Sequence, residues 1–442
     1  MNEQTRDFIR ENADKDIRLL ALSAKKNPDV DLSFALDQIA GRQTARQKLP
    51  SWAATDDIVY PPHLSMEQCS SEQTARYKMK LSSPSPHPSS KPSHPSSLID
   101  LTGGFGVDFS FMSRGFERAV YVERLENLCD IARHNFALLG MDNAEVVCGD
   151  GVDYLKSLDR VSVIYLDPAR RNEHGGKTYA ISDCTPDVIE LKDLLLQKAD
   201  RVIVKLSPML DWHKAISDLG DAVAEVHIVS VDNECKELLL VMQSPEAEDV
   251  SRKTVKVVCV NNEEEFVFWS VGVKECWSEN CLTPNPSPKG EGSSNKLSSL
   301  IPHPSSTEST NSSTCQLVNS STESPFLYEP NASIMKAGCF SAIEQTFGVK
   351  QLERNSHLFV SESFVEDFPG RKFLIRAVTT MNKKDIKKAL SGIDKANISV
   401  RNFPISVAEL RKRLKIKEGG SDYIFATTLI DKSHVLLLCS RL

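Results

Sequence analysis

The feature that most constrains this chain is a regular alternation of strand and helix patterns between residues 98 and 245. Segments with helical periodicity separate five short apolar runs, which are SLIDL, AVYVE, AEVVCGD, VSVIYLD and RVIVKLSP. Such alternation predicts an α/β fold with a parallel sheet covered by helices on both faces. Two further strand patterns, EVHIVSV and ELLLVM, flank the polar turn DNECK and predict an antiparallel pair at one edge. A helix is expected through residues 188–196, with Thr185 as its N-cap and Pro186 as its first residue.

Two stretches rich in serine and proline interrupt the globular pattern. Residues 81–97 and 282–324 bury too little apolar surface to offset their ordering entropy, so they are predicted to be a linker and a disordered insertion. Residues 1–80 before them are predicted to be a helical domain, with Leu32, Ala35, Leu36 and Ile39 on one apolar face and a capping box at Ser65 and Gln68. This domain either packs as a cap on the next one or helps to bind substrate.

Composition excludes several classes of protein. The 442 residues carry a net charge of -7, which argues against wholesale nonspecific nucleic-acid binding but leaves room for a local basic patch. The chain has no apolar run long enough to cross a bilayer, and its polar, acid-containing N-terminus does not read as a secretory signal. Eleven scattered cysteines without a CxxC pair predict reduced thiols in the cytoplasm and no metal site.

Charged side chains follow all five predicted parallel strands. Asp100, Glu123, Asp150 and Asp167 come at or just after the ends of the first four, and Lys205 lies at the end of the fifth. Ligands of open parallel sheets bind beyond the carboxyl ends of the strands. These five side chains are therefore expected to surround one binding site.

The first strand end carries a glycine-rich turn led by an acid. Asp100 is followed by Thr102, Gly103, Gly104 and Gly106, a G-G-x-G spacing that differs from the GxGxxG of dinucleotide sites. An acid before the glycines would repel a pyrophosphate, and it suits a ligand with an amino group and no phosphate. S-adenosylmethionine has an ammonium, a sulfonium and no phosphate, so the turn is predicted to bind that cofactor.

The other strand ends suggest complementary roles. Glu123 can accept both hydroxyls of a ribose and Asp150 can accept the adenine amino group, although a plain surface acid and a plain turn residue remain open readings. Asp167 and Pro168 are placed to hold an exocyclic amine for methylation, unless Asp-Pro is only a loop breaker. Arg170 and Arg171 could hold a phosphate or carboxylate of the substrate, with Arg170 also counted among the catalytic residues.

These residues together resemble a known superfamily. DLTGGFG, Glu123, Gly149-Asp150 and DPAR are similar to motifs I to IV of the class I, Rossmann-like, S-adenosylmethionine-dependent methyltransferases, over residues 98–245. The core is also similar to a bacterial small-subunit rRNA guanine-N2 methyltransferase. Thr102 stands where the common pattern has a glycine. Ala169 and Arg170 replace the second proline and the aromatic residue of the usual nitrogen-methyltransferase motif, which leaves the acceptor atom open.

The rest of the chain resembles bacterial methyltransferases with a C-terminal THUMP-like domain. YEPNASIMKAG, LFVSE and RLKIKEGGSDYIFATTL are similar to their tail, and QCSSEQTARYK to their N-terminal part. The resemblance implies a strand-rich connection over 246–281, a small ferredoxin-like α+β segment over 325–368 and a THUMP-like domain over 369–442. Ser406 and Glu409 should form a capping box there, ahead of a helix that buries Val407, Leu410 and Leu414.

THUMP domains are associated with RNA binding, so the resemblance implies an rRNA or tRNA substrate. Lys412 and Arg413 lie in a basic run that could contact phosphates, although a solvated helix face has the same pattern. No membrane and no obligate protein partner is expected. The leading hypothesis is an RNA base methyltransferase. The alternatives are a methyltransferase for a protein or small molecule, a non-catalytic RNA-binding module, and an oxidoreductase, which the glycine spacing disfavours.

Overall fold

The computed structural model describes residues 2–23, 28–83, 95–170, 181–244, 254–271, 282–284 and 326–442. These residues belong to two compact units. Among the described residues, the first unit comprises those up to Val231 together with 236–244 and 254–255, and the second comprises Asp232–Cys235, Lys256–Val271 and those from 282 onward. The predicted disordered segments lie largely outside the described residues, as does Arg171. None of the described helices combines the length and apolarity that a membrane span needs.

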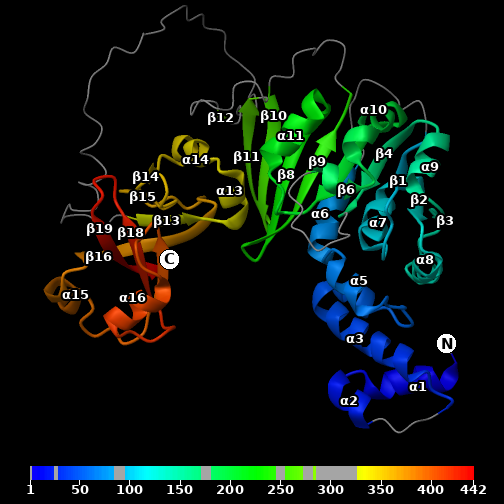
Figure 1. Ribbon diagram of the computed structural model, residues 1–442, viewed down its shortest axis with the longest axis horizontal. Coiled ribbons are helices and arrows are strands. Elements are labelled where there is room, and N and C mark those ends of the chain that lie inside the picture. The colour runs from blue at the N-terminus through cyan, green and yellow to red at the C-terminus, as the bar shows by residue number, and fades with distance from the viewer. Residues whose placement is uncertain are drawn as a thin grey trace, which may run out of the picture. The chain divides into compact units, whose positions relative to one another are not determined.

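The first unit contains the predicted α/β sheet (Figure 1), with strand order β3-β2-β1-β4-β7-β9-β8. The strands are β1 (Ser97–Asp100), β2 (Arg118–Glu123), β3 (Ala144–Cys148), β4 (Val161–Leu166), β7 (Ala199–Leu206), β8 (Val223–Val231) and β9 (Glu234–Met242). The first five pair in parallel, and β9 runs antiparallel to β7, which confirms the predicted fold class. Strand order reverses between β1 and β4, where open sheets of this kind form their ligand crevice.

Helices connect the parallel strands and pack along the sheet (Figure 1). They are α7 (Val107–Met112), α8 (Glu126–Leu138), α9 (Gly151–Ser157), α10 (Val188–Lys198) and α11 (Trp212–Leu219), with the short turns η1 (Ser113–Gly115), η2 (Ile181–Asp183) and η3 (Gly220–Ala222). Phe109, Tyr121 and Phe136 join α7, β2 and α8 in one buried aromatic cluster. This cluster fixes α7, the helix after the glycine turn, against β2.

The predicted start of α10 is wrong by two residues. Asp187 caps the helix, because its carboxylate accepts the backbone N–H groups of Ile189 at 2.9 Å and Glu190 at 3.3 Å. Thr185 instead lies in β6 (Cys184–Thr185), which pairs antiparallel with β5 (Ala169–Arg170). The pairing of β5 with β6 therefore precedes the helix.

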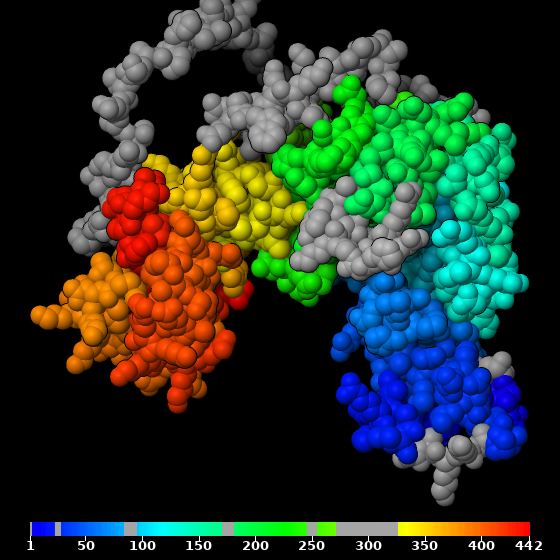
Figure 2. All heavy atoms as spheres, in the orientation of Figure 1, coloured from blue at the N-terminus to red at the C-terminus, as the bar shows by residue number. Residues whose placement is uncertain are grey.

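The N-terminal helices belong to the same unit as the sheet. They are α1 (Glu3–Asn12), α2 (Ile17–Ser23), α3 (Leu32–Lys48), α4 (Pro50–Ala53), α5 (His63–Gln68) and α6 (Glu72–Ser82). Phe105 of the glycine turn inserts among them, with its ring 4.9 Å from that of Trp52. Figure 2 shows the N-terminal helices, in blue, meeting the cyan part of the unit directly. The capping box predicted at Ser65 is wrong, because α5 begins at His63 and Ser71 caps the next helix instead.

The second unit contains a seven-stranded sheet with the order β14-β15-β13-β16-β19-β18-β17. The strands and helices in and around this sheet are β13 (Phe326–Pro330), α13 (Ala332–Ala337), α14 (Phe340–Phe347), β14 (Lys350–Gln351), β15 (Phe359–Ser361), β16 (Gly370–Thr380), α15 (Lys383–Ala389), β17 (Asn397–Arg401), α16 (Val407–Leu414), β18 (Asp422–Thr428) and β19 (His434–Arg441). Three further strands, β10 (Thr254–Asn261), β11 (Glu264–Val271) and β12 (Leu282–Pro284), are not part of the seven-stranded sheet. Ser406 caps α16 as predicted, and Leu410 and Leu414 are buried. Val407 is exposed, because it lies in the first turn beyond the edge of the apolar stripe.

Candidate active site

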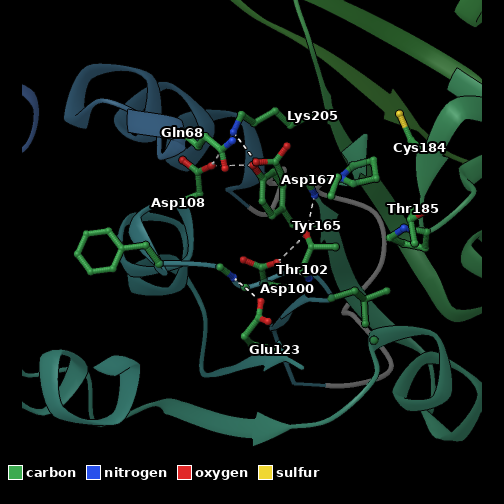
Figure 3. Close-up of a pocket in the computed structure, with 18 of the residues that line it drawn as sticks. Gln68, Asp100, Thr102, Asp108, Glu123, Tyr165, Asp167, Cys184, Thr185 and Lys205 are labelled. Carbon is green, nitrogen blue, oxygen red and sulfur yellow. Dashed lines mark hydrogen bonds and ion pairs between the residues drawn. The ribbon is translucent and has the colours of Figure 1, made fainter. Parts of the chain in front are cut away.

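A cavity of about 1380 Å³ opens at the carboxyl ends of β1, β2, β4 and β7. The structure brings together in its lining the residues predicted from the strand ends, which are Asp100, Thr102, Gly103, Gly104, Gly106, Glu123, Asp150, Asp167, Pro168 and Lys205 (Figure 3). Arg170 lies in β5 and its side chain is outside the described residues, as is all of Arg171. Single-ligand pockets usually measure about 300–1,000 Å³, so this cavity has room for two ligands side by side.

The glycine turn is packed against β2 and α8 so closely that two of its positions exclude a side chain. A methyl group on Gly103 would come within 2.2 Å of the Tyr121 ring, and one on Gly106 within 2.7 Å of the Phe136 ring. Gly104 has a φ of +55°, and only the Thr102 carbonyl oxygen would lie within 4 Å of a methyl group there. The turn thus presents bare backbone to the cavity, and the Tyr121 hydroxyl, which donates to the Gly104 carbonyl, holds it in place.

Glu123 ties the glycine turn to the end of β2. Its Oε2 accepts the Gly104 N–H at 2.9 Å, and its Oε1 accepts the Leu125 N–H at 2.9 Å. Each carboxylate oxygen has two acceptor positions, so both oxygens retain one for a ligand. The arrangement leaves a fixed pair of acceptor oxygens at the cavity wall.

Asp100 is an almost fully buried acid at the base of the cavity. Its Oδ1 accepts the Thr102 N–H at 2.9 Å, and no lysine or arginine within the described ranges forms an ion pair with it. Burial raises the pKa of the Asp100 carboxyl well above its usual range, although the Thr102 hydrogen bond acts to lower it. The charges of Asp108, Asp167 and Glu123 raise the pKa further. A ligand cation at this position would favour the ionised form.

Thr102 links the ends of β1 and β4. Its hydroxyl oxygen accepts the Asp167 backbone N–H at 2.6 Å and lies 3.4 Å from Asp100 Oδ1, to which the hydroxyl donates (Figure 3). A glycine at this position could not make either contact. The departure from the common glycine pattern therefore has a structural role, because it sets the start of the Asp-Pro loop.

Lys205, at the end of β7, is paired with Asp167. Its ammonium nitrogen lies 2.5 Å from Asp167 Oδ2 and 3.8 Å from Asp108 Oδ2. Burial acts to lower the pKa of Lys205, but Asp167, Asp108 and Glu237 outweigh it, so the pKa is raised and the lysine remains an ammonium. The pair places a carboxylate acceptor and a cationic donor side by side where β4 and β7 end at the cavity.

Asp150 has a structural task as well as a place in the lining. Its Oδ1 accepts the N–H groups of Val152 at 2.8 Å and Asp153 at 3.2 Å, which makes it the N-cap of α9. The second carboxylate oxygen makes neither of these bonds and remains at the exposed rim. Asp150 thus has a local structural role as a helix N-cap, and its second carboxylate oxygen can still accept a hydrogen bond from a ligand.

Sequence reasoning missed several residues of the site. Asp108 lies at the start of α7, directly behind the glycine turn, and Gln68, Cys69 and Ser70 reach the cavity from the N-terminal helices (Figure 3). Asp108 accepts hydrogen bonds from Tyr165 at 2.7 Å and Ser70 at 2.9 Å. Asp108 follows the DLTGGFG motif by two residues, and this proximity is the sequence feature that could have indicated its place in the site. The N-terminal part of the chain therefore contributes to the cavity lining.

The two predicted RNA-contacting residues lie in the second unit. Lys412 is exposed on α16 and lines a shallow groove of about 650 Å³ with Arg411, Lys415 and Lys417. Arg413 is on the same helix and pairs with Glu409 one turn earlier. Both side chains are free of the buried stripe that holds the helix to its sheet.

Comparisons with known proteins agree with this architecture. Residues 326–369 match a ferredoxin-like domain model, and residues 370–441 match the model of the THUMP domain-like family. A crystal structure of a candidate methyltransferase from Porphyromonas gingivalis W83 aligns over 100% of this chain and 99% of its own, with 29% identity and a TM-score of 0.77. A comparison with curated protein sequences gives no match.

Other solved structures align only in part. A SAM-dependent methyltransferase from Agrobacterium tumefaciens is 14% identical, over 40% of this chain and 63% of its own, with a TM-score of 0.29. An rRNA methylase from Streptococcus thermophilus is 10% identical, over 38% of this chain and 93% of its own, with a TM-score of 0.27. Neither carries weight for the function. The sheet order, the full-length alignment and the family model together establish that the chain has the class I, Rossmann-like methyltransferase fold and a C-terminal THUMP-like domain.

Proposed function

We propose that the protein is an S-adenosylmethionine-dependent methyltransferase that modifies a nitrogen of an RNA base. The observation that carries the proposal is the convergence of Asp100, Glu123 and Asp167 on one two-ligand cavity beside an open glycine turn. The same cavity would repel a dinucleotide, because the buried Asp100 occupies the place where a pyrophosphate would need donors.

The residues present fit the cofactor. Gly104 offers bare backbone, Glu123 offers two acceptors for ribose hydroxyls, and Asp100 offers a buried carboxyl that lacks a protein cation among the described residues. Asp150 would accept from the adenine amino group. When bound, adenosylmethionine supplies a methyl group activated by a sulfonium. Residues of the chain then have only to align the acceptor, and alignment alone can supply about 7–11 kcal/mol of a reaction barrier.

Asp167 would hold the acceptor nitrogen and manage its proton. Lys205 engages Oδ2, which leaves Oδ1 to accept a hydrogen bond from an exocyclic amine. After the nitrogen gains a methyl group it carries one surplus proton, and Asp167 Oδ1 is the acceptor at hand. Pro168 fixes the backbone after Asp167 and so restricts where the carboxylate can turn.

RNA as the substrate rests on the second unit. The THUMP domain-like match and the exposed basic groove at Lys412 support RNA binding, and the groove has the positive charge that phosphate contacts require. Arg413 would contribute further phosphate contacts from α16. Arg170 and Arg171 would add substrate contacts near the Asp-Pro loop.

A labelled-transfer assay tests the proposal. Tritiated adenosylmethionine is incubated with total RNA and, separately, with RNase-treated extract, and nucleosides are then identified by mass spectrometry. We expect label in one methylated nucleoside. Asp167→Ala should abolish transfer while calorimetry still detects cofactor binding, and the exposed Asp159→Ala should change neither. Binding of cofactor with transfer only into protein or a small molecule would refute the RNA assignment, and no cofactor binding would refute the enzyme assignment.

A methyltransferase for a protein or small molecule is the second candidate function. Ala169 occupies the position where base-modifying enzymes carry a stacking ring, and it lines the cavity without offering a ring face. RNA binding that does not weaken with salt would favour this alternative, because phosphate contacts necessarily release counterions.

A further inference from the structure

Five charged side chains form an alternating series that runs from the cavity into the interior of the first unit. We name it the charge ladder: Asp167, Lys205, Asp108, Lys78 and Glu237. The closest nitrogen–oxygen distances between successive members are 2.5, 3.8, 3.1 and 2.6 Å. Figure 3 shows its cavity end, where Lys205 lies between Asp167 and Asp108.

The ladder is buried everywhere except at the cavity. The exposed fraction of the side chain is 41% for Asp167 but 0% for Lys78 and 3% for Glu237. Its remaining polar positions are largely satisfied, because Asp108 also accepts from Tyr165 and Ser70, and Lys78 also donates to Ser70 at 3.1 Å. Such a buried series contributes little net stability compared with apolar residues of the same volume. Its presence therefore calls for a role beyond packing.

The members come from five separate elements. Asp167 follows β4, Lys205 ends β7, Asp108 begins α7, Lys78 lies in α6, and Glu237 lies in β9. The inner of the two cations, Lys78, is thus supplied by α6, the last N-terminal helix, which lies outside the strand-end motifs.

Removal of any inner member leaves its neighbours as uncompensated buried charges. Lys78 and Lys205 outweigh the effect of burial on Asp108 and lower its pKa, so Asp108 stays ionised and attracts Lys205. Burial raises the pKa of Glu237, although the charges of Lys78 and Lys205 act in the opposite direction.

We propose that the charge ladder positions the Asp167 carboxylate for methyl transfer, and that Lys78, which does not line the cavity, is a positioning residue for this reaction. The inference rests on the proposed function. Lys78 fixes Asp108, Asp108 fixes Lys205, and Lys205 fixes Oδ2 of Asp167, so that Oδ1 faces the acceptor. The N-terminal helical domain is thereby part of the catalytic site.

The test uses a charge-balanced variant of the full chain, Lys78→Met with Glu237→Gln, because it removes one cation and one anion together. Loss of a charge-assisted hydrogen bond predicts a fall in the single-turnover transfer rate of roughly 10- to 100-fold, with the cofactor Kd within about twofold of the unaltered protein. Arg76→Met is the matched control, because Arg76 is in the same helix and pairs with Glu72 outside the ladder. It should leave the rate unchanged.

A cycle with Lys205→Met separates positioning from general destabilisation. If the ladder acts as one unit, adding Lys205→Met to the balanced variant causes no further loss. The proposal would be overturned if the rate losses of the balanced variant and of Lys205→Met multiplied. It would also be overturned if the balanced variant were as fast as the unaltered protein. A fold defect does not mimic the expected result, because cofactor binding is measured on the same samples.

A crystal structure of the balanced variant keeps this test independent of activity. We expect the Asp167–Lys205 contact to be lost or displaced in it. If the unaltered protein transfers no methyl group to any acceptor, the proposed function fails. In that case the crystal structure still tests the charge ladder, and a variant that keeps the Asp167–Lys205 contact would refute it. Loss of the contact would sustain the ladder as the device that orients Asp167.

Discussion

The Thr102 hydroxyl accepts the backbone N–H of Asp167 at 2.6 Å, which fixes the end of β4 to the glycine turn after β1. Thr102→Val keeps the shape of the side chain but leaves that N–H without its partner, at a cost of about 1–3 kcal/mol when such a group is buried. We expect a lower Tm and a transfer rate that falls more than the cofactor affinity does. Thr102→Ser, which retains the hydroxyl, should behave like the unaltered protein in both thermal denaturation and single-turnover assays.

Asp100 is expected to lower the stability of the cofactor-free protein while it favours cofactor binding. Because its folded-state pKa is raised, the folded protein holds this proton more tightly than the unfolded chain, and the resulting stability is lost as pH rises through the folded pKa. Asp100→Asn should therefore raise the Tm of the cofactor-free protein at neutral and alkaline pH, and the gain should shrink toward pH 4. About 1 kcal/mol corresponds to roughly 2–4 °C in a domain of this size.

The same variant should lose adenosylmethionine affinity, because an amide does not compensate an ammonium. In the unaltered protein the affinity should increase as pH rises through the Asp100 pKa. Calorimetric titrations across pH measure both effects. A variant that is less stable than the unaltered protein at pH 8, or that binds the cofactor equally well, would contradict this account of Asp100.

Glu123→Gln should weaken cofactor binding and loosen the glycine turn. An amide has one oxygen, so one of the two backbone donors, Gly104 N–H or Leu125 N–H, would face an NH₂ group. Loss of a charged hydrogen bond implies roughly a 10- to 100-fold increase in Kd. Hydrogen exchange at Gly104 should accelerate. Glu145→Gln serves as the control, since Glu145 lies on the neighbouring β3 and pairs with the exposed Arg118.

Lys412→Ala with Arg413→Ala tests the RNA surface of α16. Each lost phosphate contact should reduce the slope of log K against log salt by about one, with weakening that is uniform across RNA sequences. Cofactor affinity should not change. Lys156→Ala, an exposed lysine of the first unit, is the control. An unchanged salt slope in the double variant would show that this helix face is merely solvated.

Much of the first unit could be predicted from sequence because its signals are local. Each strand run and the acid at its end are adjacent in the chain, and parallel pairing necessarily brings such ends to one edge. Helix starts were harder to predict. Asp187 and Ser71 cap their helices, whereas Thr185 and Ser65 do not. A carboxylate or hydroxyl caps a helix only where the backbone lets it reach the free N–H groups.

The partners of buried charges could not be predicted in the same way. Lys78 and Glu237 are 159 residues apart, and nothing in the sequence near either one marks the other. Likewise the closeness of Gly103 to Tyr121 depends on how β2 packs, although the glycine itself was an evident feature. Local patterns predict which elements form, whereas pairings between distant elements emerge only once the sheet is assembled.

The insertion of Phe105 among the N-terminal helices has a practical consequence for protein engineering. The sheet cannot be excised at the Ser/Pro-rich linker and grafted onto a different RNA-targeting module, because the excised piece would carry an exposed aromatic anchor on its own glycine turn. A transplantable unit has to begin before Ala45, so that the ring travels together with the buried cluster that encloses it.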